Sequence, residues 1–316
     1  DRTRKPILDA LNEQLLRLVD DYTSGERPYS ELLTTRRAHY NGMLMHWRKY
    51  LAARLNSSRP YNDYVPEDGD FPEPIDWNSD WQVIERSGVH AGILTLPAYT
   101  LRFQTNRGRA NRFRIAFRGQ YFQPPDVDDK EGCEQITDDL VNRCVCRKCH
   151  ETLEPLAAHF GAISERGSLM LTGFTKEFAT EAECDYQSNL DGFVDTRFCL
   201  YLYRETVTSQ SDPTPVWRLN ALQWADGAPE HATTEKNFDA GPRVMAQEAI
   251  DEGVFARATI MNLFRFLFHR DMLLDSVTSD SELNLLDELQ KEFEEHDDIK
   301  RLTKRLVMLP AYRRTP

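Results

Sequence analysis

Apolar residues recur at helical spacing near both ends of the chain. Over 6–21 they lie three and four positions apart, which predicts an amphipathic helix. The same pattern predicts one or two helices over 29–55, and strong periodicity predicts further helices over 242–269, 281–293 and 298–309. The chain is therefore expected to adopt a mainly α-helical fold.

Proline-rich and acidic stretches interrupt this pattern over 56–80 and 209–238, which predicts long irregular loops. Two prolines followed by aspartates at 124–129 mark a boundary. Because one hydrophobic core rarely exceeds about 250–300 residues, several packed parts are expected. We expect an N-terminal helical domain over 1–125, a small domain with the cysteines over 126–210, an elaborated loop over 211–241 and a C-terminal helical domain over 242–316.

The charge balance narrows the classes of function. Lys and Arg number 39 against 51 Asp and Glu, a formal net charge of −12, so the uniform positive field needed for general nucleic-acid binding is missing. No apolar run approaches the roughly 20 residues of a transmembrane helix. The sequence starts at Asp1, with no initiator Met and with neither the basic nor the apolar region of a signal peptide at that point. We therefore expect a mature exported chain whose signal peptide has been removed, or a piece of a longer protein.

One short motif carries specific chemistry. Cys146-Arg147-Lys148-Cys149-His150 is C-x-x-C-H, the attachment motif of a c-type haem. Two thiols at this spacing can share one side of a helical turn and form thioether links to the porphyrin, while the histidine that follows ligates the iron. At this composition the motif arises by chance in about three chains in a thousand. The sequence predicts one covalent haem c.

Two other kinds of site use the same cysteines. Cys144, Cys146, Cys149 and His150 could form a zinc set, although structural zinc sites usually pair two C-x2-4-C knuckles and the remaining cysteines are isolated. A thioredoxin-like redox pair would need a βαβ pattern around it, which the sequence lacks. We also expect a short helix over 131–143 and a second helix that begins at Glu154-Pro155.

The region around the motif resembles a known family. The segment 146–156 is similar to the C-x-x-C-H-x-x-x-D-P-hydrophobic segment of the planctomycete-type cytochrome c proteins. The similarity covers about two thirds of the chain, and only the haem motif is a specific match to the family. Its other parts are 90–96 with Thr105, Arg112 and 123–125 upstream, and 255–270 with 309–313 in the C-terminal helical segment.

The sequence departs from the family pattern at three places. Glu154 stands where the family usually has Asp, Ala157 replaces a Gly, and His269 replaces the Gly that precedes an Arg. The family's long N-terminal segments are also missing. The resemblance implies a haem-bearing protein of the bacterial cell envelope and names no reaction.

Two residues are candidates for the second axial ligand of the iron. Met170 is the first candidate, because a Met thioether raises the reduction potential, and its alternative role is core filling. His269 is the second candidate, and its alternative is a helix-end histidine near terminal carbonyls. His159 is expected at the surface, with a polar or second-haem role as the alternative.

Four cysteines remain once the haem takes two. Thioether attachment takes place in an oxidising compartment, where disulfides are permitted. Cys133 with Cys144 and Cys184 with Cys199 would each close a short loop, but four cysteines allow three connectivities. Free thiols are the alternative.

A basic segment at 102–118 holds six arginines interleaved with phenylalanines. A solvated arginine face is the expected explanation. The alternatives are a docking patch for an acidic partner and charge compensation for an anionic cofactor.

These observations favour a mono-haem c-type cytochrome that carries single electrons in the periplasm or cell envelope, within a larger complex of redox partners or other subunits. The chain lacks the G-x-S-x-G, H-E-x-x-H, P-loop and G-x-G-x-x-G motifs of common enzymes, so an electron-transfer role is favoured over catalysis. The alternatives are a structural subunit whose haem only stabilises it, and a haem enzyme with an open distal site.

Overall fold

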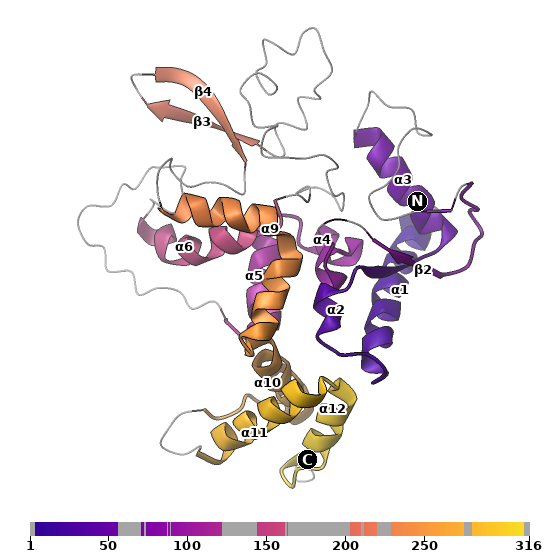
Figure 1. Ribbon diagram of the computed structural model, residues 1–316, viewed down its shortest axis with the longest axis vertical. Helices are drawn as coiled ribbons and strands as arrows, with labels where there is room; N and C mark the ends of the chain where they lie inside the picture. The colour runs from indigo at the N-terminus through magenta and orange to yellow at the C-terminus, as the bar shows by residue number, and fades with distance from the viewer. Residues whose placement is uncertain are drawn as a thin grey trace.

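The computed structural model describes residues 4–55, 71–121 without 73, 87 and 89, 144–161, 163, 203–209, 212–219, 229–274 and 280–312. These residues form a mainly helical structure, as the sequence predicted (Figure 1). The helices are α1 (Arg4–Thr23), α2 (Glu31–Thr34), α3 (Gly42–Leu55), α4 (Pro97–Arg102), α5 (Asn106–Phe117), α6 (Cys144–Ala158), α9 (Pro229–Asp251), α10 (Val254–Phe268), α11 (Asp280–His296), α12 (Ile299–Val307) and the short 3-10 helix η2 (Gly92–Thr95). The strands are β1 (Arg37–Tyr40), β2 (Gln82–Glu85), β3 (Tyr203–Ser209) and β4 (Asp212–Leu219).

The N-terminal helices surround one hydrophobic core. Leu18 and Tyr22 on the buried side of α1 pack with Leu44 and Met45 of α3, and all four are almost fully buried. The helix expected over 6–21 is confirmed as α1. The stretch 29–55 differs from expectation, because β1 separates α2 from α3 and pairs antiparallel with β2. The alternation of buried and half-buried positions along β1 is typical of a strand.

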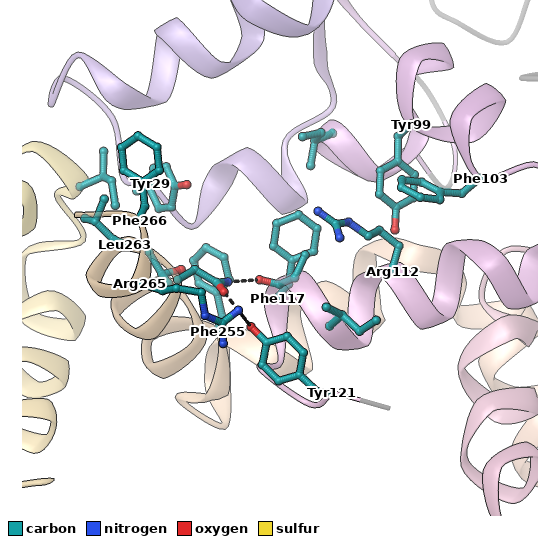
Figure 2. A pocket seen from close by; sticks show the side chains of 16 residues that line it. Tyr29, Tyr99, Phe103, Arg112, Phe117, Tyr121, Phe255, Leu263, Arg265 and Phe266 are labelled. Carbon is teal, nitrogen blue, oxygen red and sulfur yellow. Dashed lines mark hydrogen bonds between the residues drawn. The ribbon is translucent and has the colours of Figure 1, made fainter. Parts of the chain in front are cut away.

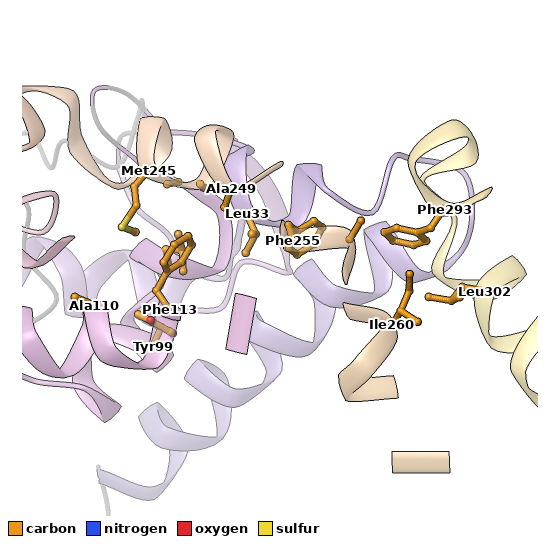
Figure 3. Close-up of a cluster of buried hydrophobic side chains, with 14 of the residues drawn as sticks. Leu33, Tyr99, Ala110, Phe113, Met245, Ala249, Phe255, Ile260, Phe293 and Leu302 are labelled. Carbon is orange, nitrogen blue, oxygen red and sulfur yellow. The ribbon is translucent and has the colours of Figure 1, made fainter. Parts of the chain in front are cut away.

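A second core joins α5 and α6 with the C-terminal helices. Most of its aromatic side chains are phenylalanines, among them Phe113 of α5, Phe160 after α6, and Phe255 and Phe264 of α10. Figure 3 shows Phe113 and Phe255 in this cluster, with Leu33 beside Phe255. Helix α5 packs against both α6 and α10, so the arginine-rich segment lies within the body of the protein.

The C-terminal helices follow the predicted periodicity except at one break. The helix expected over 242–269 is divided between α9 and α10, because Gly253 adopts a left-handed conformation with φ 72°. The helices expected over 281–293 and 298–309 are confirmed as α11 and α12. Asp298 caps the first turn of α12 by accepting hydrogen bonds from the backbone N–H groups of Lys300 and Arg301.

The stretch expected as a loop over 211–241 contains regular structure instead. Strands β3 and β4 form an antiparallel hairpin, and the first half of α9 follows. The β-branched residues Thr206, Val207 and Val216 favour the hairpin, and the prolines of β4 are tolerated because each strand of a two-stranded ribbon has an open edge. Within the described ranges, no helix is both long enough and apolar enough to cross a membrane.

Candidate haem-binding site

Helix α6 carries the whole C-x-x-C-H motif on one continuous helix. At 100° per residue, Cys146, Cys149 and His150 lie within about 100° of arc around the helix axis, whereas Cys144 lies about 120° or more outside that arc. The motif therefore presents two cysteines and the histidine on one side. The zinc alternative is not supported by this helix, because Cys144 lies on the other side.

The helix expected to begin at Glu154-Pro155 does not exist as a separate element. Helix α6 continues through Pro155 to Ala158. Pro155 cannot donate a backbone hydrogen bond, which normally destabilises a helix interior. Helix α9 supports this turn from outside, because Asn237 Nδ2 donates to the carbonyl oxygen of Pro155 at 2.9 Å. Figure 1 shows α6 alongside the first half of α9.

His150 is held by a buried carboxylate one helical turn away. Nδ1 of His150 lies 2.5 Å from Oε1 of Glu154, and the Nε of Arg107 donates to the same oxygen at 2.6 Å. Glu154 is completely buried. A carboxylate can only accept here, so Nδ1 of His150 donates the proton of this contact, and Nε2 is the ring nitrogen that Glu154 does not engage.

The imidazole of His150 is partly accessible to solvent. The side chain of His150 keeps 17% of its surface accessible, and no described residue makes a hydrogen bond or ion pair with its Nε2. Oε2 of Glu154 is also buried, with no hydrogen-bond partner among the described residues. Burying an ionised carboxylate is costly unless it is paired, and Arg107 supplies the opposite charge.

The structure describes only some of the other candidate residues. Cys149 is half-buried and is a free thiol. The side chains of Cys144 and Cys146 lie outside the described part of the chain, as do the helix expected over 131–143 and four residues of the sequence analysis: Met170, Cys133, Cys184 and Cys199. His269 is exposed at the end of α10 in a left-handed conformation with φ 55°. Among the described residues, no group of three or more His, Cys, Asp or Glu side chains could hold a metal ion.

His159 is buried, and the expectation that it lies at the surface is wrong. Only 2% of its surface is exposed, and Nδ1 donates to the carbonyl oxygen of Gly241 at 2.9 Å. Gly241 has non-helical dihedral angles at a kink inside α9, and Pro242 follows it. His159 therefore satisfies a backbone carbonyl at this kink. Burial lowers the pKa of His159 to about 4, although the hydrogen bond to Gly241 acts in the opposite direction.

The sequence predicted a solvated arginine face over 102–118. Of the six arginines of this segment, only Arg102 and Arg112 are exposed. Arg109 is fully buried and donates to the carbonyl oxygens of Phe103, Thr100 and Ile163 and to the side chain of Asn106. The remaining three make specific contacts: Arg107 with Glu154, Arg114 with Thr152 of α6, and Arg118 with Glu252 at 2.7 Å.

From the sequence, Glu154 was expected only to begin a helix and to depart from the family pattern. Its position four residues after His150 was the signal that could have revealed the contact, because such pairs are neighbours on a helix. The partnership with Arg107 has no comparable local signal, since the two residues are far apart in the chain. Comparison of the chain with protein-family models, curated proteins and solved structures finds no match.

Proposed function

We propose that the chain is a mono-haem c-type cytochrome that carries single electrons in the bacterial periplasm or cell envelope, as the resemblance to planctomycete-type cytochrome c proteins implies. Cys146 and Cys149 would attach the haem, and His150 would ligate its iron through Nε2. When bound, the haem supplies an iron that takes up and releases one electron. Other proteins of an envelope complex would exchange electrons with it.

The observation that carries this proposal is the contact between Nδ1 of His150 and Glu154. A histidine that ligates a metal almost always donates its other ring N–H to a carboxylate, a carbonyl or water, which fixes the tautomer and the orientation of the ring. Glu154 meets this requirement, and it is itself held by Arg107. His150 is thus oriented with Nε2 available to a ligand.

The test is production of the full chain with periplasmic maturation, followed by a pyridine haemochrome spectrum and the mass of the intact protein. We expect a mass increase of one haem. Cys146→Ser and Cys149→Ser should each lose one thioether link. Cys144→Ser is the matched control, because Cys144 lies on the other side of α6. Absence of covalent haem from the unsubstituted chain would refute the proposal.

The same contact favours a second candidate, a haem enzyme with an open distal position. A carboxylate on Nδ1 makes the imidazole a more basic ligand, which directs electron density toward the iron. Carbon monoxide separates the two candidates. Rapid binding to the ferrous protein indicates an open iron, whereas a six-coordinate electron carrier binds it slowly or not at all.

A further inference from the structure

A pocket of about 670 Å³ lies between α5 and α10, with further walls from α4, α12 and Tyr29 (Figure 2). Seven of its sixteen lining residues are aromatic. Its volume is in the range of sites that enclose drug-sized molecules. At its rim Phe266 and Tyr121 are 74% and 42% exposed, which is unusual for large aromatic side chains.

This pocket is separate from the haem motif. On α5 the residues that line it are Arg112, Ile115, Ala116 and Phe117, whereas those whose side chains hydrogen-bond to α6 are Arg107 and Arg114. At 100° per residue, the two sets lie on different sides of α5, with mean directions roughly 160° apart. The pocket therefore needs an explanation of its own.

The polar groups along one wall of the pocket form hydrogen bonds with one another. The hydroxyl of Tyr121 donates to Oδ1 of Asn262 at 3.2 Å, and Nδ2 of Asn262 donates to the carbonyl oxygen of Ala116 at 2.9 Å. Arg265 donates to the hydroxyl of Tyr121 and also to Asp271, which balances its charge. Figure 2 shows the contacts of Tyr121 and Arg265 together on one side of the pocket. The polar groups of this wall are thus already paired.

Arg112 differs in its pairing from the polar groups of this wall. Its guanidinium lies 5.8 Å from the centre of the Phe103 ring, and no carboxylate of the described chain pairs with it. Among the sixteen described residues that line the pocket, none is Asp or Glu. Within the described part of the chain, this pocket therefore has a positive charge beside aromatic rings that no acidic side chain balances.

We propose that the pocket binds a small organic carboxylate with an aromatic body. Tyr99, Phe117 and Phe255 line the pocket and give it aromatic walls against which an aromatic group can pack. The planar guanidinium of Arg112 can bind a carboxylate through two parallel hydrogen bonds. A small molecule fits better than a protein partner, because the space is a concave pocket rather than a broad flat surface.

The test uses isothermal titration calorimetry on the full chain with 2-naphthoate and its neutral counterpart 2-naphthalenemethanol. We expect saturable binding of one 2-naphthoate per chain, about tenfold tighter than the alcohol. Arg112→Gln should weaken 2-naphthoate binding about tenfold, because the variant loses the positive charge that pairs with the carboxylate, and should leave the alcohol unchanged. Because Arg112 is exposed, this variant should fold normally.

Arg102→Gln is the matched control, since Arg102 is also exposed and does not line the pocket. Ala116→Phe should place a ring in the pocket and abolish binding of both probes, with circular dichroism to verify the fold. Three outcomes overturn the proposal: no saturable binding of either probe, equal binding of the two probes, or equal weakening by Arg102→Gln and Arg112→Gln. Haem loading does not affect these outcomes, so they are independent of the proposed electron-transfer function.

Discussion

Oε1 of Glu154 accepts hydrogen bonds from Nδ1 of His150 at 2.5 Å and from Nε of Arg107 at 2.6 Å. The carboxylate thus connects the histidine of the haem motif to α5, within a protein interior where charges interact strongly. A residue in this position sets the orientation and the basicity of His150. It would act on the iron of a bound haem only through the histidine, as a positioning residue.

Replacement of Glu154 by Gln should change the electronic properties of a bound haem. In the haem-loaded protein, we expect Glu154→Gln to raise the reduction potential by on the order of tens of millivolts, because a neutral amide makes His150 a weaker electron donor. A spectroelectrochemical redox titration measures this shift. Glu248→Gln, at an exposed position of α9, is the matched control and should leave the potential unchanged.

A potential that is unchanged in Glu154→Gln, with haem content equal to that of the original protein, would show that Glu154 has only a structural role. Loss of covalent haem from this variant would contradict a role limited to positioning His150, because Glu154 takes no part in the thioether bonds proposed at Cys146 and Cys149.

The buried His159 should make stability depend on pH. Its pKa is lowered to about 4 in the folded protein, against about 6.5 when unfolded, so the unfolded state binds the proton more readily. Stability is therefore fully present above pH 6.5 and declines as the pH falls toward 4. The expected loss between pH 7 and pH 4.5 is about 2–3 kcal/mol, measured by urea unfolding.

His159→Asn tests this assignment, because an Asn amide can still donate to Gly241 but does not titrate in this range. The variant should lose less stability than the original protein between the same two pH values. Other groups titrate equally in both proteins, so the difference isolates His159. An equal loss in both proteins would contradict the assignment.

Gly92 should not tolerate any side chain. Its φ is +38°, and a Cβ there would lie 1.9 Å from the carbonyl oxygen of Leu32, which belongs to the backbone and cannot move aside cheaply. We expect Gly92→Ala to lower the free energy of unfolding by about 3 kcal/mol or more. Gly88 is the control: its φ is +62°, but a Cβ would meet nothing within 4 Å. Gly88→Ala should cost only about 1 kcal/mol of backbone strain.

Two phenylalanines of α10 should respond differently to truncation. Phe264 is buried and stacks on Phe268, with ring centres 4.2 Å apart, so Phe264→Ala should cost about 3–5 kcal/mol. Phe266 is 74% exposed on the same helix, and Phe266→Ala should change stability by no more than about 0.5 kcal/mol. Chemical denaturation of both variants measures the contrast, and similar losses would contradict the packing described for α10.

The sequence determined those features that depend on near neighbours in the chain. Periodic apolar residues were sufficient to predict α1, α11 and α12, because a helix buries one side at a spacing set by its own geometry. The grouping of Cys146, Cys149 and His150 also follows from local helical spacing. The contact of Glu154 with His150 belongs to this class, although only the structure revealed it.

Tertiary structure alone decided the features that join distant segments. Strand β1 exists because β2, more than forty residues later, supplies its hydrogen-bond partners. Arg109 is buried because surrounding carbonyl groups accept its protons, and His159 is buried because α9 has a kink at Gly241. Such environments depend on how helices pack against one another, and no local pattern of residues records that packing.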